Sequence, residues 1–388
     1  IMVVPRDMDV HHFTPIQHPA DDKTSGTITT HFDYHSISSR LVKLDILGHD
    51  DPTVIRMLED LTDIDAKIIS LDDAETMSLF SSTSALGLTP KELGSTVGTF
   101  GIPEFGTKFV RQMLEDTTPK TFSELVRISG FSHGTDVWLN NAQDLIKAGT
   151  AKLSEAISAR DDIMMYLIHK GVESQLAFKV MESVRKGKGI KPDDVQKLRE
   201  KDVPDWYIGS CQKIKYMFPK AHAVAYVMMA FRIAYCKVHH PLAFYASYFS
   251  VRGTEFDADL VLQGQTALRS RLAEYEAKGN TITAKEKSMQ AIIEVALEMY
   301  LRGFTFERVD LYKSHATNFL IVDNGLLPPL SSLQGLGVNA AHNIALCRQG
   351  NVFSSLEDLK TRGRLSKTVI DILKGHGCIA DLPESDQM

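Results

Sequence analysis

The stretch Lys213-Ile-Lys-Tyr-Met-Phe-Pro-Lys-Ala-His-Ala-Val-Ala-Tyr226 opens a long apolar segment that runs to His239-His240-Pro241. Pro219 suits a first helical position because its missing N–H would be unpaired there, and no proline recurs until Pro241. Lys220 and His222 then fall in the first turn, where backbone N–H groups and the helix dipole favour an anion. The stretch therefore predicts a phosphate site at a helix start, with Tyr216 as a ring for base stacking.

The same region is basic within an acidic protein. No Asp or Glu occurs between Trp206 and Thr254, although the 388-residue chain has a formal net charge of −6. This pattern indicates a surface for anions. A plain packing helix is the alternative, since apolar residues recur at helical spacing. The cations of this acid-free segment are Lys213, Lys215, Lys220, Arg232, Lys237 and Arg252.

Composition indicates an ordinary globular protein of about two to three domains, with 43% hydrophobic and 24% charged residues. No apolar run approaches the roughly 20 residues that span a bilayer, so no membrane association is expected. The four cysteines are isolated, which favours a reducing compartment and argues against a structural zinc site. A cytoplasmic location is therefore expected.

Residues 1–48 are expected to be rich in strands, and the segment Leu41–Leu47 is the most informative. Alternation places Lys43 and Asp45 on one face, while Val42, Leu44 and Ile46 are expected to form a buried apolar face. A carboxylate on a rigid strand end is a typical Mg²⁺ ligand of phosphoryl-transfer sites. The alternative is that Asp45 ends the strand and pairs with Lys43.

The middle of the chain predicts helices. Asp51 is expected to cap a helix that begins at Pro52, and further helix starts are expected at Thr89-Pro-Lys-Glu, Thr121-Phe-Ser-Glu and Arg160-Asp-Asp-Ile. The turn Arg185-Lys-Gly-Lys-Gly189 gathers Arg185, Lys186 and Lys188. These cations suit a nucleic-acid backbone, and equally a solvated helix end.

A change to mixed strand and loop near residue 303 predicts a domain boundary. Beyond it, Leu330-Ser-Ser-Leu-Gln-Gly-Leu-Gly-Val-Asn-Ala-Ala-His-Asn-Ile344 matches a helix–hairpin–helix pattern. Gly335, Leu336 and Gly337 form its turn, where glycines let backbone N–H groups approach phosphates without reading sequence. A plain helical hairpin is the alternative.

Four segments together resemble the PolC-type DNA polymerase III alpha subunit, the replicative polymerase of low-GC Gram-positive bacteria. They are Lys43-Leu-Asp-Ile-Leu-Gly-His-Asp-Asp-Pro-Thr53, Phe105-Gly-Thr-Lys-Phe109, Ser132-His-Gly-Thr-Asp-Val-Trp-Leu-Asn-Asn-Ala142 and Lys215-Tyr-Met-Phe-Pro-Lys-Ala-His-Ala223. The resemblance covers essentially the whole chain and implies its C-terminal third. It implies an α+β, predominantly helical fold: the end of the palm sheet at residues 1–60, helical fingers at 61–303, and a helix–hairpin–helix and clamp-binding region at 304–388.

The resemblance also implies a function, a DNA-directed DNA polymerase with two Mg²⁺ ions. Asp45 corresponds to one of three catalytic, metal-binding aspartates, but the Asp-x-Asp motif that supplies the other two has no match here. Asp7 and Asp9 lack its flanking residues. The fragment alone is therefore expected to be inactive.

By the same resemblance, nucleotide binding falls to Lys43, Arg160, Tyr216, Lys220 and His222. Gln387 and Met388 would begin a peptide that binds the sliding clamp. The implied partners are primer–template DNA, deoxynucleoside triphosphates, the clamp and other replisome subunits. Two alternatives stay open: a non-catalytic DNA-binding or scaffold module built on the hairpin, and a nucleotidyltransferase of another fold.

Overall fold

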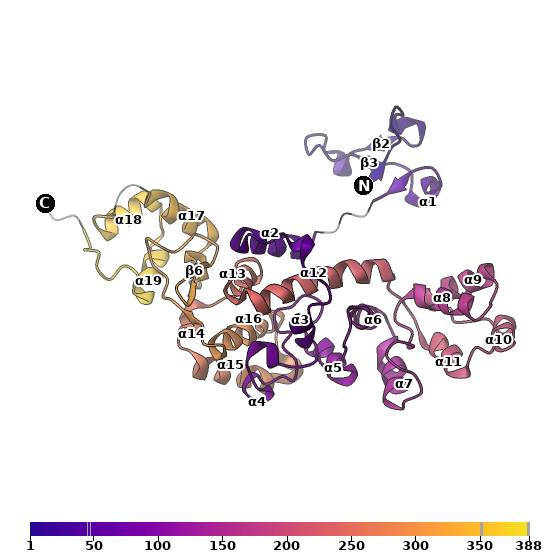
Figure 1. The fold of residues 1–388 in the computed structure, drawn as a ribbon. Coiled ribbons are helices and arrows are strands. Elements are labelled where there is room, and N and C mark those ends of the chain that lie inside the picture. Colours follow the sequence, from indigo (N-terminus) through magenta and orange to yellow (C-terminus); the bar gives the residue numbers. More distant parts are fainter. Residues whose placement is uncertain (45, 47, 350–351, 386–388) are drawn as a thin grey trace. The chain divides into compact units, whose positions relative to one another are not determined.

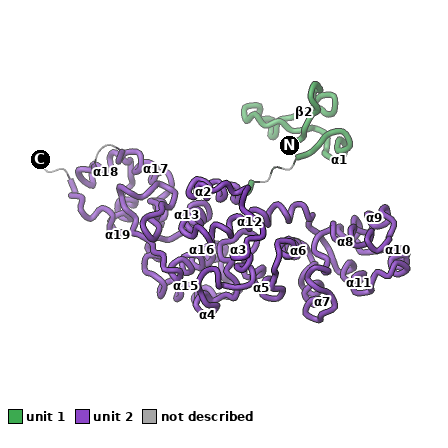
Figure 2. Tube along the Cα trace, viewed as in Figure 1, with its two compact units in different colours: residues 1–49 green, residues 50–388 purple. Residues whose placement is uncertain are grey.

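The computed structural model describes residues 1–44, 46, 48–349 and 352–385. Helices dominate it, and short strands occur near its two ends (Figure 1). The chain divides into two compact units, residues 1–49 and residues 50–388 (Figure 2). The expected α+β, predominantly helical fold is confirmed.

The first unit is built on two short antiparallel ladders. Strand β1 (Met2–Val3) pairs with β4 (Val42–Lys43), and β2 (Ile16–Gln17) pairs with β3 (Thr29–Thr30). Its helical turns are η1 (Val10–His12), η2 (Pro19–Asp21) and α1 (Tyr34–Ile37).

The prediction of a buried apolar face on residues 42, 44 and 46 is wrong for this unit. Val42 is 62% exposed, and Leu44 and Ile46 are also exposed, whereas Leu41 is buried. The reason is that the β1–β4 ladder is only two residues long, and no second layer of the described part of this unit covers that face.

The second unit is organised around α12 (Lys220–His239), which packs against five other helices. Its apolar face, with Ala223, Val227, Phe231 and Ala234, is buried, so the packing interpretation of this helix is also correct. The partners are α2 (Asp51–Thr62), α3 (Ala74–Ser78), α6 (Phe122–His133), α8 (Arg160–His169) and α13 (Pro241–Arg252).

Smaller helices complete this unit. The predicted starts at Thr89 and Thr121 are confirmed, since both residues form capping boxes, with Glu92 and Glu124 respectively. Helices α8 and α9 make close mutual contact, as do α15 and α16. The bounds are α4 (Pro90–Leu93), α5 (Lys108–Thr117), α7 (Gln143–Lys147), α9 (Ser174–Arg185), α10 (Pro192–Arg199), α11 (Asp205–Lys213), α14 (Ala258–Val261), α15 (Gln265–Lys278) and α16 (Ala284–Leu301). Short helical turns are η3 (Ala66–Ile68), η4 (Ser84–Leu86), η5 (Trp138–Ala142) and η6 (Gly279–Thr281).

The C-terminal part of the second unit carries a three-stranded sheet in the order β5 (Thr305–Phe306), β7 (Gly325–Leu327), β6 (Leu320–Val322). β5 runs parallel to β7 and β6 runs antiparallel to it. The aromatic rings of Phe249, Phe256, Phe306 and Phe319 cluster between α13 and this sheet. After the sheet come η7 (Leu330–Ser332), α17 (Val338–Cys347), α18 (Leu356–Gly363) and α19 (Lys367–His376).

The compact units divide between residues 49 and 50, eleven residues before the expected palm boundary. Helix α2 packs on α12 and α13 and thus belongs to the second unit. The assignment of palm, fingers and clamp-binding regions stays a prediction. Among the described helices, none is long and apolar enough to cross a membrane.

Candidate nucleotide and DNA-binding sites

The start of α12 is engaged by carboxylates of the protein itself. The main-chain N–H of Lys220 donates to a carboxylate oxygen of Asp161 at 2.8 Å, and Lys220 Nζ lies 3.2 Å from Asp162 Oδ1. The sequence predicted an N–H open to a phosphate at this position, and for Lys220 that expectation is wrong. The cause is α8, whose first turn contributes both aspartates.

Asp162 is the centre of this arrangement. Its side chain is only 9% exposed, and it accepts hydrogen bonds from Ser158 Oγ at 2.7 Å and Ala159 N at 2.9 Å. The guanidinium of Arg127 lies 3.4 Å away. Burial by itself would raise the pKa of the Asp162 carboxyl, but Arg127, the hydrogen bonds from Ala159 and Ser158, and Lys220 hold it below its ordinary value. Asp162 therefore stays ionised and ties the α8 start to Lys220.

Aromatic rings surround the same helix start. Phe218 stacks on His133, with ring centroids 4.7 Å apart and planes at 22°, and meets His222 edge-on at 4.8 Å. The rings of His222 and Tyr226 are 4.5 Å apart. Flat aromatic rings, each partly exposed, therefore line the surface next to Lys220.

Tyr216 is held at its backbone and leaves its ring in solvent. Thr135 N donates to Tyr216 O at 3.0 Å, and the side chain of Tyr216 is 48% exposed. Arg160 joins the site through its own N–H, which donates to Phe218 O at 3.2 Å. The structure thus brings together Arg160, Tyr216, Lys220 and His222, four of the five residues predicted to bind nucleotide.

The fifth residue, Lys43, lies in β4 of the first compact unit. Asp45, the predicted catalytic metal ligand, lies outside the described residues, as do the predicted clamp-binding residues Gln387 and Met388. Within the described ranges, no three His, Cys, Asp or Glu side chains come together in a group that could hold a metal ion.

The acid-free segment does not form a uniform basic surface. Three of its six cations pair with acids from remote segments: Lys237 with Glu298 at 2.8 Å, Arg252 with Asp51, and Lys220 with Asp162. Asp51 was expected to be a helix cap, but it is fully buried in this ion pair, and Asp50 occupies the N-cap position. Lys213 donates to a main-chain oxygen, that of Asn140, at 2.6 Å.

The cations at the C-terminal end of α9 and just after it are also partly neutralised. Glu182 pairs with Arg185, at 2.8 Å between Glu182 Oε2 and Arg185 Nη2, and with Lys186 at 3.0 Å. Hydrogen bonding to Arg185 lowers the pKa of Glu182 to about 2, and Lys186 adds to the effect. Lys188 is exposed.

This turn lies beside the nucleotide candidates. A Cβ built on Gly187 would stand 2.6 Å from Lys215 O, so the turn packs directly against the main chain that precedes Tyr216. The structure therefore places the cationic turn at residues 185–189 next to the predicted nucleotide-binding residues, two sites that the sequence predicts separately.

The predicted hairpin turn lies between η7 and α17. Gly335 has a φ of +88°, and a Cβ there would approach Ile372 Cδ1 to 2.9 Å, so the turn requires glycine at this position. Leu336 is 3% exposed and packs into the core. Gly337 is the N-cap of α17, nothing lies within 4 Å of a Cβ built on it, and residues 337–339 are exposed.

Sequence reasoning missed the two aspartates and His133. The sequence presents Asp161 and Asp162 only as part of a helix start, and His133 only as part of a segment that carries the family resemblance. The signal was present, because an Arg-Asp-Asp run at a helix start carries more acid than one cap requires. The partner of Asp162 is Lys220, which lies 58 residues further along the chain, and no local sequence pattern indicates that the two pair.

Two family models match the chain. The "bacterial DNA polymerase III alpha subunit finger domain" matches residues 51–204, and the "helix-hairpin-helix motif" matches residues 303–387.

Curated relatives match along the whole chain. A protein of Caldanaerobacter subterraneus is 63% identical over 388 residues, one of Bacillus subtilis 58% over 388 residues, and one of Thermotoga maritima 56% over 387 residues. Each is named DNA polymerase III PolC-type, and the chain spans 27% to 28% of their length. The chain is thus similar along its whole length to a segment that makes up 27% to 28% of these PolC-type DNA polymerase III proteins.

Proposed function

We propose that the complete protein is a replicative DNA-directed DNA polymerase, which adds deoxynucleotides to a primer 3′ end. One observation carries the proposal: Arg160, Tyr216, Lys220 and His222 gather at one helix start in a chain similar throughout to PolC-type polymerases. A cation, helix-start amides and an exposed ring are the groups that bind a triphosphate and stack on a base.

In this proposal the residues around α12 have separate tasks. Lys220 and His222 bind phosphate oxygens of the incoming nucleotide, and Arg160 contributes further positive charge. Tyr216 offers its exposed ring to a base. The triphosphate binds at the edge of a site that already holds Asp161, so it must compete with that carboxylate for the N–H of Lys220.

The chemical step requires groups from the first unit and from outside this chain. We propose Asp45 as one carboxylate ligand of two Mg²⁺ ions, with Lys43 near the incoming triphosphate. When bound, the ions would neutralise the triphosphate charge and activate the primer hydroxyl. The other ligands would come from a part of the family's palm that has no match in this chain.

DNA would be held by charge and by backbone amides. We propose that Arg185, Lys186 and Lys188, together with the Gly335-Leu336-Gly337 turn, contact the phosphate backbone, and that buried Leu336 holds the turn in shape. Such contacts carry no sequence information and weaken steeply with salt. We also propose that Gln387 and Met388 begin a peptide that binds the sliding clamp. Other replisome subunits are proposed as further partners, and the cytoplasm as the location of the protein.

Primer extension tests the function. Asp45→Asn in the full-length protein removes a charged ligand at little steric cost, so incorporation with Mg²⁺ should be abolished while DNA binding survives. The 388-residue chain by itself should be inactive, because a single aspartate is too few ligands for two ions. Extension at near wild-type rate by the full-length Asp45→Asn variant would refute the assignment of the metal site. Salt-independent DNA binding would refute the backbone contacts.

A further inference from the structure

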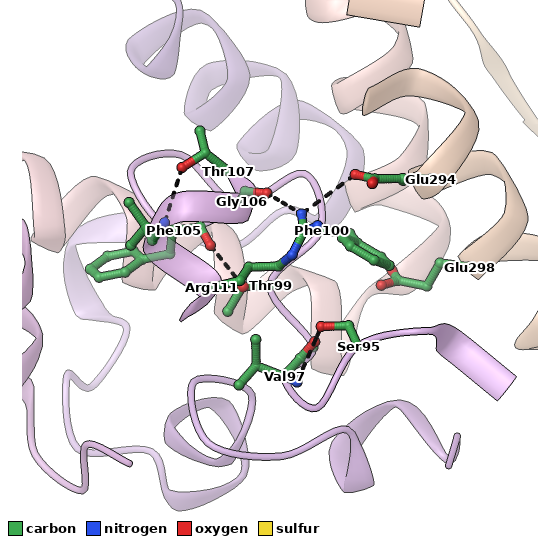
Figure 3. A network of polar contacts seen from close by, with 12 residues as sticks. Ser95, Val97, Thr99, Phe100, Phe105, Gly106, Thr107, Arg111, Glu294 and Glu298 are labelled. Carbon is green, nitrogen blue, oxygen red and sulfur yellow. Dashed lines mark hydrogen bonds and ion pairs between the residues drawn. The ribbon is translucent and has the colours of Figure 1, made fainter. Parts of the chain in front are cut away.

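The loop between α4 and α5 is held from several sides. Thr99 Oγ1 donates to Phe105 O at 2.8 Å, and Arg111 Nη1 donates to Gly106 O at 2.5 Å while lying 3.4 Å from Glu294 (Figure 3). The Arg111 guanidinium also covers the Phe100 ring, 4.5 Å from its centroid. These contacts fix the backbone on both sides of residues 102–104.

A buried ion pair supports the loop from beneath. Lys237 Nζ lies 2.8 Å from Glu298 Oε1 and donates to the carbonyl oxygens of Gly98, at 2.8 Å, and Phe100, at 2.6 Å. Both charged side chains are fully buried. Burial lowers the pKa of Lys237 to about 8, and Glu298 opposes that shift. A charged pair at this depth has a high desolvation cost, which these contacts of Lys237 offset. They tie the loop to α16, and we call the loop residues 98–106, held in this way, the platform.

The platform presents Glu104 in an unusual backbone conformation. Its φ is +66°, in the left-handed region that glycine adopts readily and that a long side chain adopts rarely. The side chain is nevertheless 13% exposed and ordered by a contact. Residues whose strained backbone conformation is held in place by surrounding contacts occur often at functional sites.

That contact leads to the nucleotide candidates. A carboxylate oxygen of Glu104 meets His133 Nε2 at the end of α6. The His133 ring stacks on Phe218, and Phe218 meets His222 edge-on, so a continuous row of contacts runs from Glu104 to the first turn of α12. His133 has a side-chain exposure of 38%, and its ring is held by the Glu104 carboxylate at Nε2 and by Phe218 across its face.

We propose that Glu104 is a positioning residue for the incoming nucleotide: its carboxylate fixes the His133 ring, and through Phe218 this sets where His222 meets the triphosphate. The inference rests on the proposed polymerase function and deepens it. Glu104 itself also lines a cavity of about 500 Å³ together with Lys108, Arg111 and Glu294. Its carboxylate, however, is engaged with His133.

The test is steady-state primer extension by the full-length polymerase, with the nucleotide concentration varied. Glu104→Ala should raise KM for the nucleotide roughly 5- to 30-fold with little change in kcat, because a charge-assisted hydrogen bond is lost. Glu104→Gln keeps the shape and one acceptor, so it should recover most of the loss. His133→Ala should resemble Glu104→Ala, and the double variant should be no worse than either alone.

Two further variants separate positioning from folding. Glu104→Gly suits the left-handed backbone, so the melting temperature should be kept while KM still rises. Glu115→Ala is the matched control, because Glu115 is exposed on α5, contacts Thr96, and lies outside the ring row. It should leave KM unchanged. DNA affinity, measured by fluorescence anisotropy, should be the same for all variants.

An unchanged KM in a folded Glu104→Ala or Glu104→Gly protein would overturn the proposal. So would a parallel fall in kcat, DNA affinity and melting temperature, which is the signature of a purely structural residue. If the wild-type protein extends primers and only the Glu104 effect is absent, the polymerase function stands and the positioning role fails. A wild-type protein that does not extend a primer would overturn both.

Discussion

The main-chain N–H of Lys220 donates to the carboxylate of Asp161 at 2.8 Å, so the first turn of α12 already holds an anion that belongs to the protein. Helix starts stabilise negative charge through their free amides and their dipole. In the proposed polymerase an incoming triphosphate therefore meets both a favourable helix end and a competing carboxylate. We therefore expect Asp161 to weaken nucleotide binding, while its carboxylate satisfies the N–H of Lys220 when no nucleotide is present.

Asp161→Asn in the full-length polymerase should bind nucleotide more tightly. The amide oxygen can still accept from Lys220, but the negative charge is gone, so KM should fall about two- to fivefold. Primer extension at varied nucleotide concentration measures this. Asp193→Asn is the matched control, since Asp193 is an exposed aspartate in the first turn of α10. A higher KM for Asp161→Asn would show instead that the carboxylate orients Lys220 productively.

Asp162 should make a contribution to stability that depends on pH in a defined window. Its pKa is lower in the folded protein than the ordinary value of 3.8, so the stability it contributes is present above that value and is lost as pH falls through the folded pKa. At pH 7, Asp162→Asn should cost about 2–3 kcal/mol, because Arg127 and Lys220 lose their charged partner.

Denaturant unfolding of wild type and Asp162→Asn at pH 7, 5 and 3 measures this dependence. The difference between the two should be constant from pH 7 to pH 5 and should shrink at pH 3. Asp193→Asn should show no comparable difference at any of these pH values. A difference that grows as the solution becomes more acidic would contradict the assigned sign.

Local features of the fold could be predicted from the sequence because they depend on neighbours in the chain. The capping boxes at Thr89 and Thr121 and the long helix that follows Pro219 all follow from residues within one or two turns. The gathering of Tyr216, Lys220 and His222 likewise follows from their closeness in sequence.

Pairings between remote segments could not be predicted. The acid-free segment predicts a surface for anions, but Lys237 pairs with Glu298, 61 residues away in the sequence, and Arg252 pairs with Asp51, 201 residues away. Charge balance in a folded protein is set in space, and a local excess of cations does not reveal it. The exposed face of β4 also depends on residues that are remote in sequence. Alternation predicts which side chains share a face of a strand, but it does not predict whether another layer covers that face.

Glu182→Gln should strengthen nonspecific DNA binding of the full-length protein. Glu182 holds Arg185 and Lys186, and its low pKa of about 2 keeps it charged at neutral pH. Without the carboxylate both cations can meet phosphates, so affinity should rise and the slope of log K against log salt should steepen by up to about 2.

Anisotropy titrations over a range of salt concentrations measure the change. Glu200→Gln, which removes one exposed charge at the end of α10, is the control and should leave the slope as in wild type. An unchanged slope for Glu182→Gln would mean that these cations form a solvated helix end, the alternative that the sequence left open.

The hairpin glycines should separate folding from DNA contact. Gly335→Ala places a Cβ at a φ of +88° and 2.9 Å from Ile372 Cδ1, so it should cost about 1–2 kcal/mol of stability. Gly337 has a φ of −67° and no atom near a built Cβ, so Gly337→Ala is not strained; because Ala is a poorer N-cap than Gly, it should cost about 0.5–1 kcal/mol.

If DNA phosphates approach the turn closely, the two variants should diverge in a second way. The methyl group of Gly337→Ala would stand where a phosphate would meet the α17 amides, so DNA affinity should fall about 3- to 10-fold in a protein that is still folded at the assay temperature. Thermal unfolding and anisotropy on the full-length protein measure the two effects. Equal DNA affinity for Gly337→Ala and wild type would place the DNA backbone away from this turn. The glycine at 335 would then be required by the hairpin's own packing, because its left-handed φ and its contact with Ile372 need no ligand to explain them.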